Sequence, residues 1–106
     1  MEKYINNKGE VGVLVSEGYG SGWSTWNDIR YSDYLCMDKT LVEMKLDGAS
    51  AGEVEEHILK AKGIYVSTAG WSDAEVVWVE KGIAFTMVVR DGDESLEYIM
   101  TNCMVA

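Results

Sequence analysis

The sequence predicts one α+β domain: an antiparallel sheet of four to five strands, ending in a C-terminal meander, with two helices packed on one face. Three observations lead to this fold class. A short β-type run comes early, two helix-type segments occupy the middle, and β-type segments fill the second half. With 106 residues, the chain has the length of one domain, and two domains would each be too small to be stable.

The first strand and the first helix are marked by short local signals. Val11–Val15 is a β-type run, and a polar, glycine-rich loop follows it through Asn27. Asp38 has the side chain of a helix cap, and the helix it starts is expected to run to about Leu46. Gly48 then provides a natural stop.

The second helix has stronger signals. Ser50 and Glu53 have the spacing of a capping box, and Gly63 ends the helical pattern. The apolar stripe of this helix is expected to consist of Val54, Ile58, Leu59 and Ala61.

The second half of the chain is predicted to be β-structure. Ile64–Val66 leads to a turn around Gly70, and three strands are expected to follow. A two-residue turn at Lys81-Gly82 and a four-residue turn at Asp91–Glu94 join them. The three strands are Glu75–Glu80, Ile83–Arg90 and Ser95–Thr101.

These turn lengths fix the predicted register. Trp78 should lie opposite Phe85, while Met87 should lie opposite Tyr98. The shared face is expected to form the floor for the two helices. Its members are Val76, Trp78, Phe85, Met87, Val89, Leu96, Tyr98 and Met100.

Composition narrows the classes of partner. Nine basic and eighteen acidic residues give a net charge of −9, which argues against direct nucleic-acid binding and leaves a basic host protein open as a partner. No apolar run reaches a membrane span, and the N-terminus does not resemble a signal peptide. We therefore expect a cytoplasmic protein, in the host cytosol if it is phage-encoded, with Cys36 and Cys103 as free thiols.

Enzymatic residues are scarce. His57 is the single histidine and lies on the polar side of its helix, so a histidine-based triad is excluded. A zinc site would need this histidine and two distant cysteines. We expect no catalytic residues, no metal site and no cofactor.

The loop between the first strand and the helices is the candidate ligand site. It combines glycines, which permit close backbone approach, with two tryptophans and several hydrogen-bonding side chains. A second glycine–tryptophan–serine sequence at Gly70–Ser72 is expected to meet it at one end of the sheet and wall a common pocket. The alternative is that Trp23 and Trp26 are core residues that hold the loop to the sheet. The candidate ligand-binding residues are Tyr19, Ser21, Gly22, Trp23, Ser24, Thr25, Trp26, Asn27, Arg30 and Trp71.

One stretch of the chain resembles a known group of proteins. Val13–Ser16 followed by Gly20–Asn27 is similar to a motif in small, acidic, uncharacterised proteins of phages and prophages, and its specific part is Gly-Trp-Ser-Thr-Trp-Asn. Leu41–Glu43 and Trp78–Glu80 extend the likeness over most of the chain. The resemblance implies a phage-encoded accessory protein that acts against host defence. It transfers no binding residues.

Two functions follow as expectations. The first is a non-catalytic protein that sequesters a small nucleotide-like signal, with Trp23 and Trp26 stacking and Arg30 meeting a phosphate. The second is an acidic inhibitor of the DNA-mimic, anti-CRISPR-like type that binds a basic host defence protein. A homo-oligomer is compatible with the first function.

Overall fold

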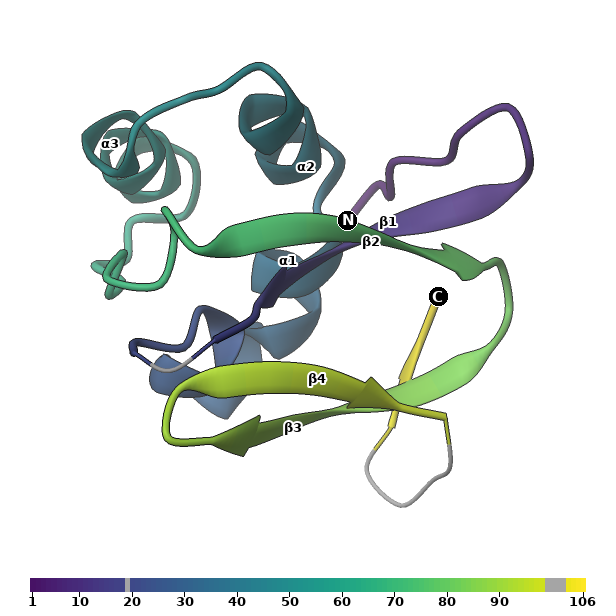
Figure 1. Ribbon diagram of the computed structural model, residues 1–106. Helices are drawn as coiled ribbons and strands as arrows, with labels where there is room; N and C mark the ends of the chain where they lie inside the picture. Colours follow the sequence, from purple (N-terminus) through teal and green to yellow (C-terminus); the bar gives the residue numbers. More distant parts are fainter. Residues whose placement is uncertain (19, 99–102) are drawn as a thin grey trace.

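The computed structural model describes residues 1–18, 20–98 and 103–106, and these residues form an α+β fold, as predicted (Figure 1). The strands form two antiparallel sheets, one of two strands and one of three, and the helices lie between the first and second strands in the chain. In chain order, the elements are β1 (Glu10–Ser16), the 3-10 helices η1 (Ser24–Trp26) and η2 (Ile29–Tyr31), α1 (Ser32–Met37), α2 (Lys39–Leu46), α3 (Ala51–Lys62), β2 (Ala74–Glu80), β3 (Ala84–Arg90), β4 (Asp93–Glu97) and β5 (Met104–Val105).

The β1–β2 sheet is the middle layer of the fold. In Figure 1, α2 and α3 lie above it and the β4-β3-β5 sheet lies below. Side chains of β1 point alternately to these two neighbours: Val11, Val13 and Val15 join one buried cluster, and Leu14 joins the other. Consequently β1 is buried on both faces, which explains its uninterrupted apolar sequence.

The predicted meander of three consecutive strands is wrong. Trp78 pairs with Gly12 of β1, not with Phe85, and β3 pairs with β4 and β5. The chain does turn at Lys81-Gly82, but the amide of Gly82 donates to the carbonyl of Ala106, which directs the chain into the second sheet. β1 is buried, so its backbone N–H and C=O groups need hydrogen-bond partners. Pairing with β2 along one edge of β1 provides them.

The predicted common face therefore divides between two cores. Val76 packs in the cluster below the helices, whereas Phe85 and Met87 pack in the other cluster, against β1. The two predicted helices, α2 and α3, lie on the β1–β2 sheet and not on the face that contains Phe85 and Met87.

The β3–β4 register differs from the prediction by two residues. Asp91-Gly92 forms a two-residue turn with positive φ at both positions, 53° and 82°, as a type I′ turn requires. Met87 therefore lies opposite Leu96, and Val89 lies opposite Glu94. A shift of two preserves the faces, so Met87 and Leu96 still point to the core. The predicted positions of Ile99–Thr101, including Met100, lie outside the described residues.

The predicted helices are confirmed with small changes. Asp38 accepts a hydrogen bond from the Leu41 amide, and Ser50 and Glu53 form the capping box. Ala61, expected in the apolar stripe of α3, is exposed, and Ile64–Val66 forms no strand. No helix in the described residues is both long enough and apolar enough to cross a membrane.

The short helix α1 was not predicted. Its N-cap, Tyr31, makes no capping hydrogen bond through its side chain. Leu35, Cys36 and Met37 are buried instead, so packing against β1 stabilises this single turn and a half of helix.

Candidate functional site

A buried carboxylate organises the glycine- and tryptophan-rich loop. Glu94 has no exposed surface, and it accepts hydrogen bonds from the backbone amides of Ser16 (2.9 Å), Trp23 (2.7 Å) and Thr25 (3.1 Å). The Thr25 hydroxyl donates a fourth at 2.6 Å. These donors come from both ends of the loop, so a single side chain of β4 closes it.

The two glycine–tryptophan–serine loops meet, as predicted. The side-chain amide of Asn27 donates to the carbonyls of Trp23 and Ser67, and its oxygen accepts from the Ser67 amide. At Gly70, a β-carbon would overlap the carbonyl of Gly22. The two loops are therefore joined directly, through the Asn27 side chain and through the close approach of Gly70 to the Gly22 carbonyl.

Trp23 and Trp71 are core residues, so the alternative interpretation, which placed Trp23 and Trp26 in the core, is right for Trp23 and wrong for Trp26. They are 0% and 1% exposed, and their rings pack edge to face with centroids 5.2 Å apart. Each indole N–H donates to a backbone carbonyl, of Leu35 and Ala49 respectively. Neither ring presents a free face to a ligand, so the structure does not support the stacking role predicted for Trp23 or ligand binding by Trp71.

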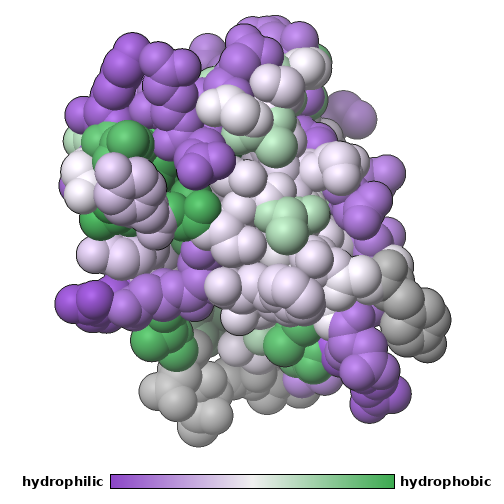
Figure 2. Space-filling view, turned by 90° about the vertical axis from the view of Figure 1, so that its left-hand side faces the viewer, coloured by the Kyte–Doolittle hydropathy of each residue, from purple (hydrophilic) through white to green (hydrophobic). Residues whose placement is uncertain are grey.

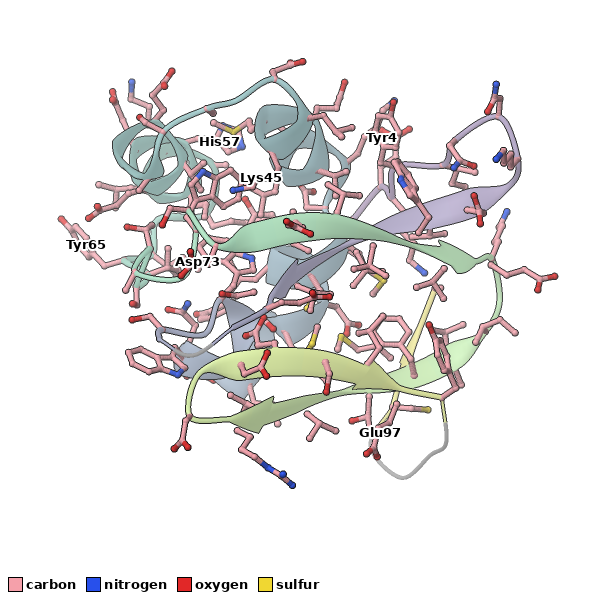
Figure 3. All side chains as sticks on the ribbon, viewed as in Figure 1. Tyr4, Lys45, His57, Tyr65, Asp73 and Glu97 are labelled. Atoms are coloured by element: carbon pink, nitrogen blue, oxygen red, sulfur yellow. The ribbon has the colours of Figure 1, made fainter. Side chains whose placement is uncertain are left out.

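Lys45 contributes to the burial of Trp71. Its ammonium lies 4.8 Å from the ring centroid and donates to the Trp71 carbonyl. Burial lowers the pKa of Lys45, and the carboxylates of Asp73 and Glu75 partly offset this. Figure 3 shows Lys45 and Asp73 on the same side of the molecule, beside the start of β2.

Trp26 is half exposed and does not pack into the core. Arg30, expected to meet a phosphate, pairs with Asp28 at 2.7 Å on the surface. The hydrogen bonds that the Arg30 guanidinium donates to the Asp28 carboxylate raise the pKa of Arg30. Ser21 uses its carbonyl to accept from the Ser16 hydroxyl. Tyr19 lies outside the described residues.

A cavity of about 340 Å³ lies beside the loop, between η1, η2 and α1 on one side and β3 and β5 on the other. Ser24, Thr25 and Asn27 form part of its wall, but their polar groups are already bonded within the protein. The other residues that line it are Ile29, Ser32, Asp33, Thr86, Met87, Cys103 and Met104. Sequence reasoning missed these residues, because nothing local brings β3 beside α1.

The cavity lining combines apolar and polar groups without a cation. The described lining residues include two methionines, the hydroxyl-bearing residues Ser32 and Thr86, and one carboxylate, Asp33. Lys and Arg are absent from this lining. Such a site suits a neutral or positively charged ligand with an apolar face.

The face that carries both loops is mixed in hydropathy. Figure 2 shows it as mostly of intermediate hydropathy, with hydrophilic residues around its rim and only small hydrophobic areas. Near the tip of the loop, the half-buried Asp93 carboxylate accepts a hydrogen bond from the Gly18 amide at 2.7 Å. No group of three or more potential metal ligands is present in the part of the chain that the structure describes.

The two cysteines are free, and they differ in environment. Cys36 is buried, and burial raises the pKa of its thiol to about 12. Cys103 is exposed and lines the cavity.

We expect a thiol reagent to modify one cysteine rapidly in the folded protein and the other only after unfolding. Cys103 should react first because it is accessible, whereas Cys36 is both inaccessible and protonated at pH 8. Mass spectrometry of peptides after timed alkylation, with and without urea, measures both rates. Equal rates in native buffer would contradict the burial of Cys36.

Comparison with protein families, curated proteins and solved structures finds no match to this chain.

Proposed function

We propose that this is a non-catalytic binding protein whose ligand occupies the cavity between η1, η2, α1 and β3. The observation that carries the proposal is the cavity itself, about 340 Å³ in volume and bordered by three residues of the unusual loop. That volume falls in the range of small-ligand sites, which begins at about 300 Å³.

The chemistry of the lining defines the class of ligand. Met87 and Met104 offer polarisable surface for a flat ring, while Ser32 and Thr86 offer hydroxyls for directional hydrogen bonds. A nucleobase with its ribose has this combination of a flat face and polar edges. We therefore propose a nucleotide-like ligand that enters through its base and ribose.

The phosphate end of such a ligand would remain outside. Asp33 repels an anion at the cavity, and Arg30 is engaged with Asp28. This replaces the stacking on Trp23 and the contact between Arg30 and phosphate that the sequence predicted. The Asp33 carboxylate also favours a base that donates a hydrogen bond to it or carries a positive charge near it.

The resemblance to small acidic phage proteins suggests the biological use. We propose that the ligand is a nucleotide-like signal of a host defence system and that binding sequesters it unaltered. This step rests on the resemblance alone. Sequestration of this kind involves no catalytic chemistry.

Cys103 provides a direct test of ligand occupancy, because it lines the cavity. Saturating adenosine or another nucleoside is expected to slow alkylation of Cys103 at least about tenfold, with a smaller effect from the corresponding triphosphate. Asp33→Asn should improve triphosphate binding relative to nucleoside binding, since it removes the repelling charge. Asp47→Asn, an exposed site at the end of α2, is the matched control.

Calorimetry with the same compounds measures affinity independently of the thiol. Protection of Cys103 that is lost in Thr86→Val, in a protein with unchanged circular dichroism, would support the proposed cavity. Unchanged alkylation across nucleosides and nucleotides, together with no heat of binding, would refute it.

A second candidate is the acidic inhibitor that binds a basic host protein. The net charge of −9 favours it, and the Asp93 carboxylate lies near the loop tip. Binding of this kind weakens steeply as salt rises, whereas nucleoside binding in the cavity changes little. A salt series therefore distinguishes the two functions.

A further inference from the structure

One edge of the middle sheet has no strand partner in the described residues. β2 pairs with β1 over seven residues along one edge, and no described strand pairs with its other edge. In Figure 1, β2 is the front strand of this sheet, and no labelled element passes in front of it. Its outward-facing backbone groups are therefore open to another strand.

The side chains of β2 are also less buried than those of β1, as expected for a strand at an open edge of a sheet. β1 is buried almost throughout, but Val76, Val77 and Trp78 at the centre of β2 are only half-buried. The sequence of β2 is rich in β-branched and aromatic residues and contains no lysine or proline, which commonly protect an edge strand from pairing.

We propose that β2 pairs with β2 of a second copy of this chain, so that two β1–β2 sheets join into one continuous antiparallel sheet. This inference is independent of the proposed ligand. The two copies are related by a two-fold axis perpendicular to the joined sheet. The same side of both β2 strands then lies on the same face of the sheet only if the residue at the axis lies opposite its own copy. Pairing all seven residues places that axis at Val77, with Ala74 opposite Glu80 of the second copy.

This register is complementary in charge. Val76 lies opposite Trp78 of the second copy, so half-buried apolar side chains cover one another. One residue beyond the strand, Asp73 lies opposite Lys81 of the second copy, and the symmetry produces this pair twice. Glu75 and Glu80 lie opposite Val79 and Ala74, so no two carboxylates oppose each other directly.

Sedimentation velocity over a range of protein concentrations tests the proposal. The wild-type protein is expected to shift from monomer to dimer, and added salt should favour the dimer, since each copy carries a net charge of −9. Lys81→Glu places like charges opposite each other at both ends and should raise the dissociation constant about tenfold or more.

Two further variants make the test specific for this edge. Combining Asp73→Lys with Lys81→Glu reverses both charges and should restore the dimer that each single change weakens. Lys60→Glu changes the net charge equally on the exposed surface of α3 and serves as the control. The dissociation constant of the Lys60→Glu dimer should be lower than that of the Lys81→Glu dimer.

Hydrogen exchange provides a second measurement. Outward-facing amides of β2 should become more protected as the protein concentration rises, whereas the amides of α3 should not change. A wild-type protein that stays monomeric at every concentration would overturn the proposal. So would a dimer that Lys81→Glu and Lys60→Glu weaken equally, or one that forms without protection of β2, because another surface would then be responsible.

Discussion

Glu94→Ala is expected to lower the free energy of unfolding by about 3–5 kcal/mol. The substitution leaves the buried amides of Ser16, Trp23 and Thr25, and the Thr25 hydroxyl, without their acceptor. Each unsatisfied buried donor costs about 1–3 kcal/mol, and water entering the space recovers part of this. Urea unfolding followed by tryptophan fluorescence measures the loss.

Glu94→Gln separates the role of the carboxylate from that of side-chain size. A glutamine keeps the volume of the side chain, but its amide nitrogen is a donor and faces another donor at the site. The free energy of unfolding is therefore expected to fall by about 1–3 kcal/mol, less than in Glu94→Ala. Glu97→Gln is the control, since Glu97 is exposed on the same strand and points away from the body of the molecule (Figure 3). It should change stability by less than about 0.5 kcal/mol.

Equal stability of Glu94→Gln and Glu97→Gln would contradict this role of the buried carboxylate. The prediction also has a functional consequence, because the loop that Glu94 closes forms one wall of the cavity. Loosening it should weaken both nucleoside binding and the protection of Cys103.

The elements with local signals were predictable from the sequence. Asp38 and Ser50 each mark a helix start by accepting a hydrogen bond from the amide three residues ahead, so these starts can be predicted without tertiary structure. The apolar run of β1 was equally clear. In contrast, α1 depends on burial against β1, which the sequence of Ser32–Met37 does not encode locally.

The sheet pairing required information that local sequence lacks. The turn at Lys81-Gly82 suits a hairpin, yet the surrounding strands enter different sheets because β1 competes for β2. The Asp91-Gly92 turn was a missed signal. Interpreted as a two-residue turn, it places Glu94 opposite Val89 on an inward face, and an acidic residue there would have been conspicuous.

For the candidate site, the sequence identified the loop and the alternative roles of its tryptophans, but not the residues that complete the cavity. Asp33 and Thr86 are more than fifty residues apart in the chain and become neighbours only when α1 packs beside β3. The meeting of the two tryptophan loops was predictable from their repeated composition. Their contact through Asn27 and Ser67 was not.

Gly92→Ala is expected to destabilise the protein by about 3 kcal/mol or more, because two costs combine. Gly92 has φ of 82°, where an alanine is strained by about 1–2 kcal/mol. A β-carbon there would also overlap the carbonyl of Gly20, which lies directly against the turn. Relieving that overlap requires the loop to move away, which breaks the hydrogen bond from the Gly20 amide to the Asp91 carbonyl.

Gly82→Ala is the matched control for backbone strain. Gly82 has φ of 91°, and a β-carbon there would meet nothing within 4 Å. It should therefore cost only the strain of about 1–2 kcal/mol. The difference between the two variants in urea unfolding isolates the contact of the loop with the β3–β4 turn. If both variants lose the same stability, the loop moves away from the turn at little cost, and the hydrogen bonds to Glu94 alone hold the loop closed.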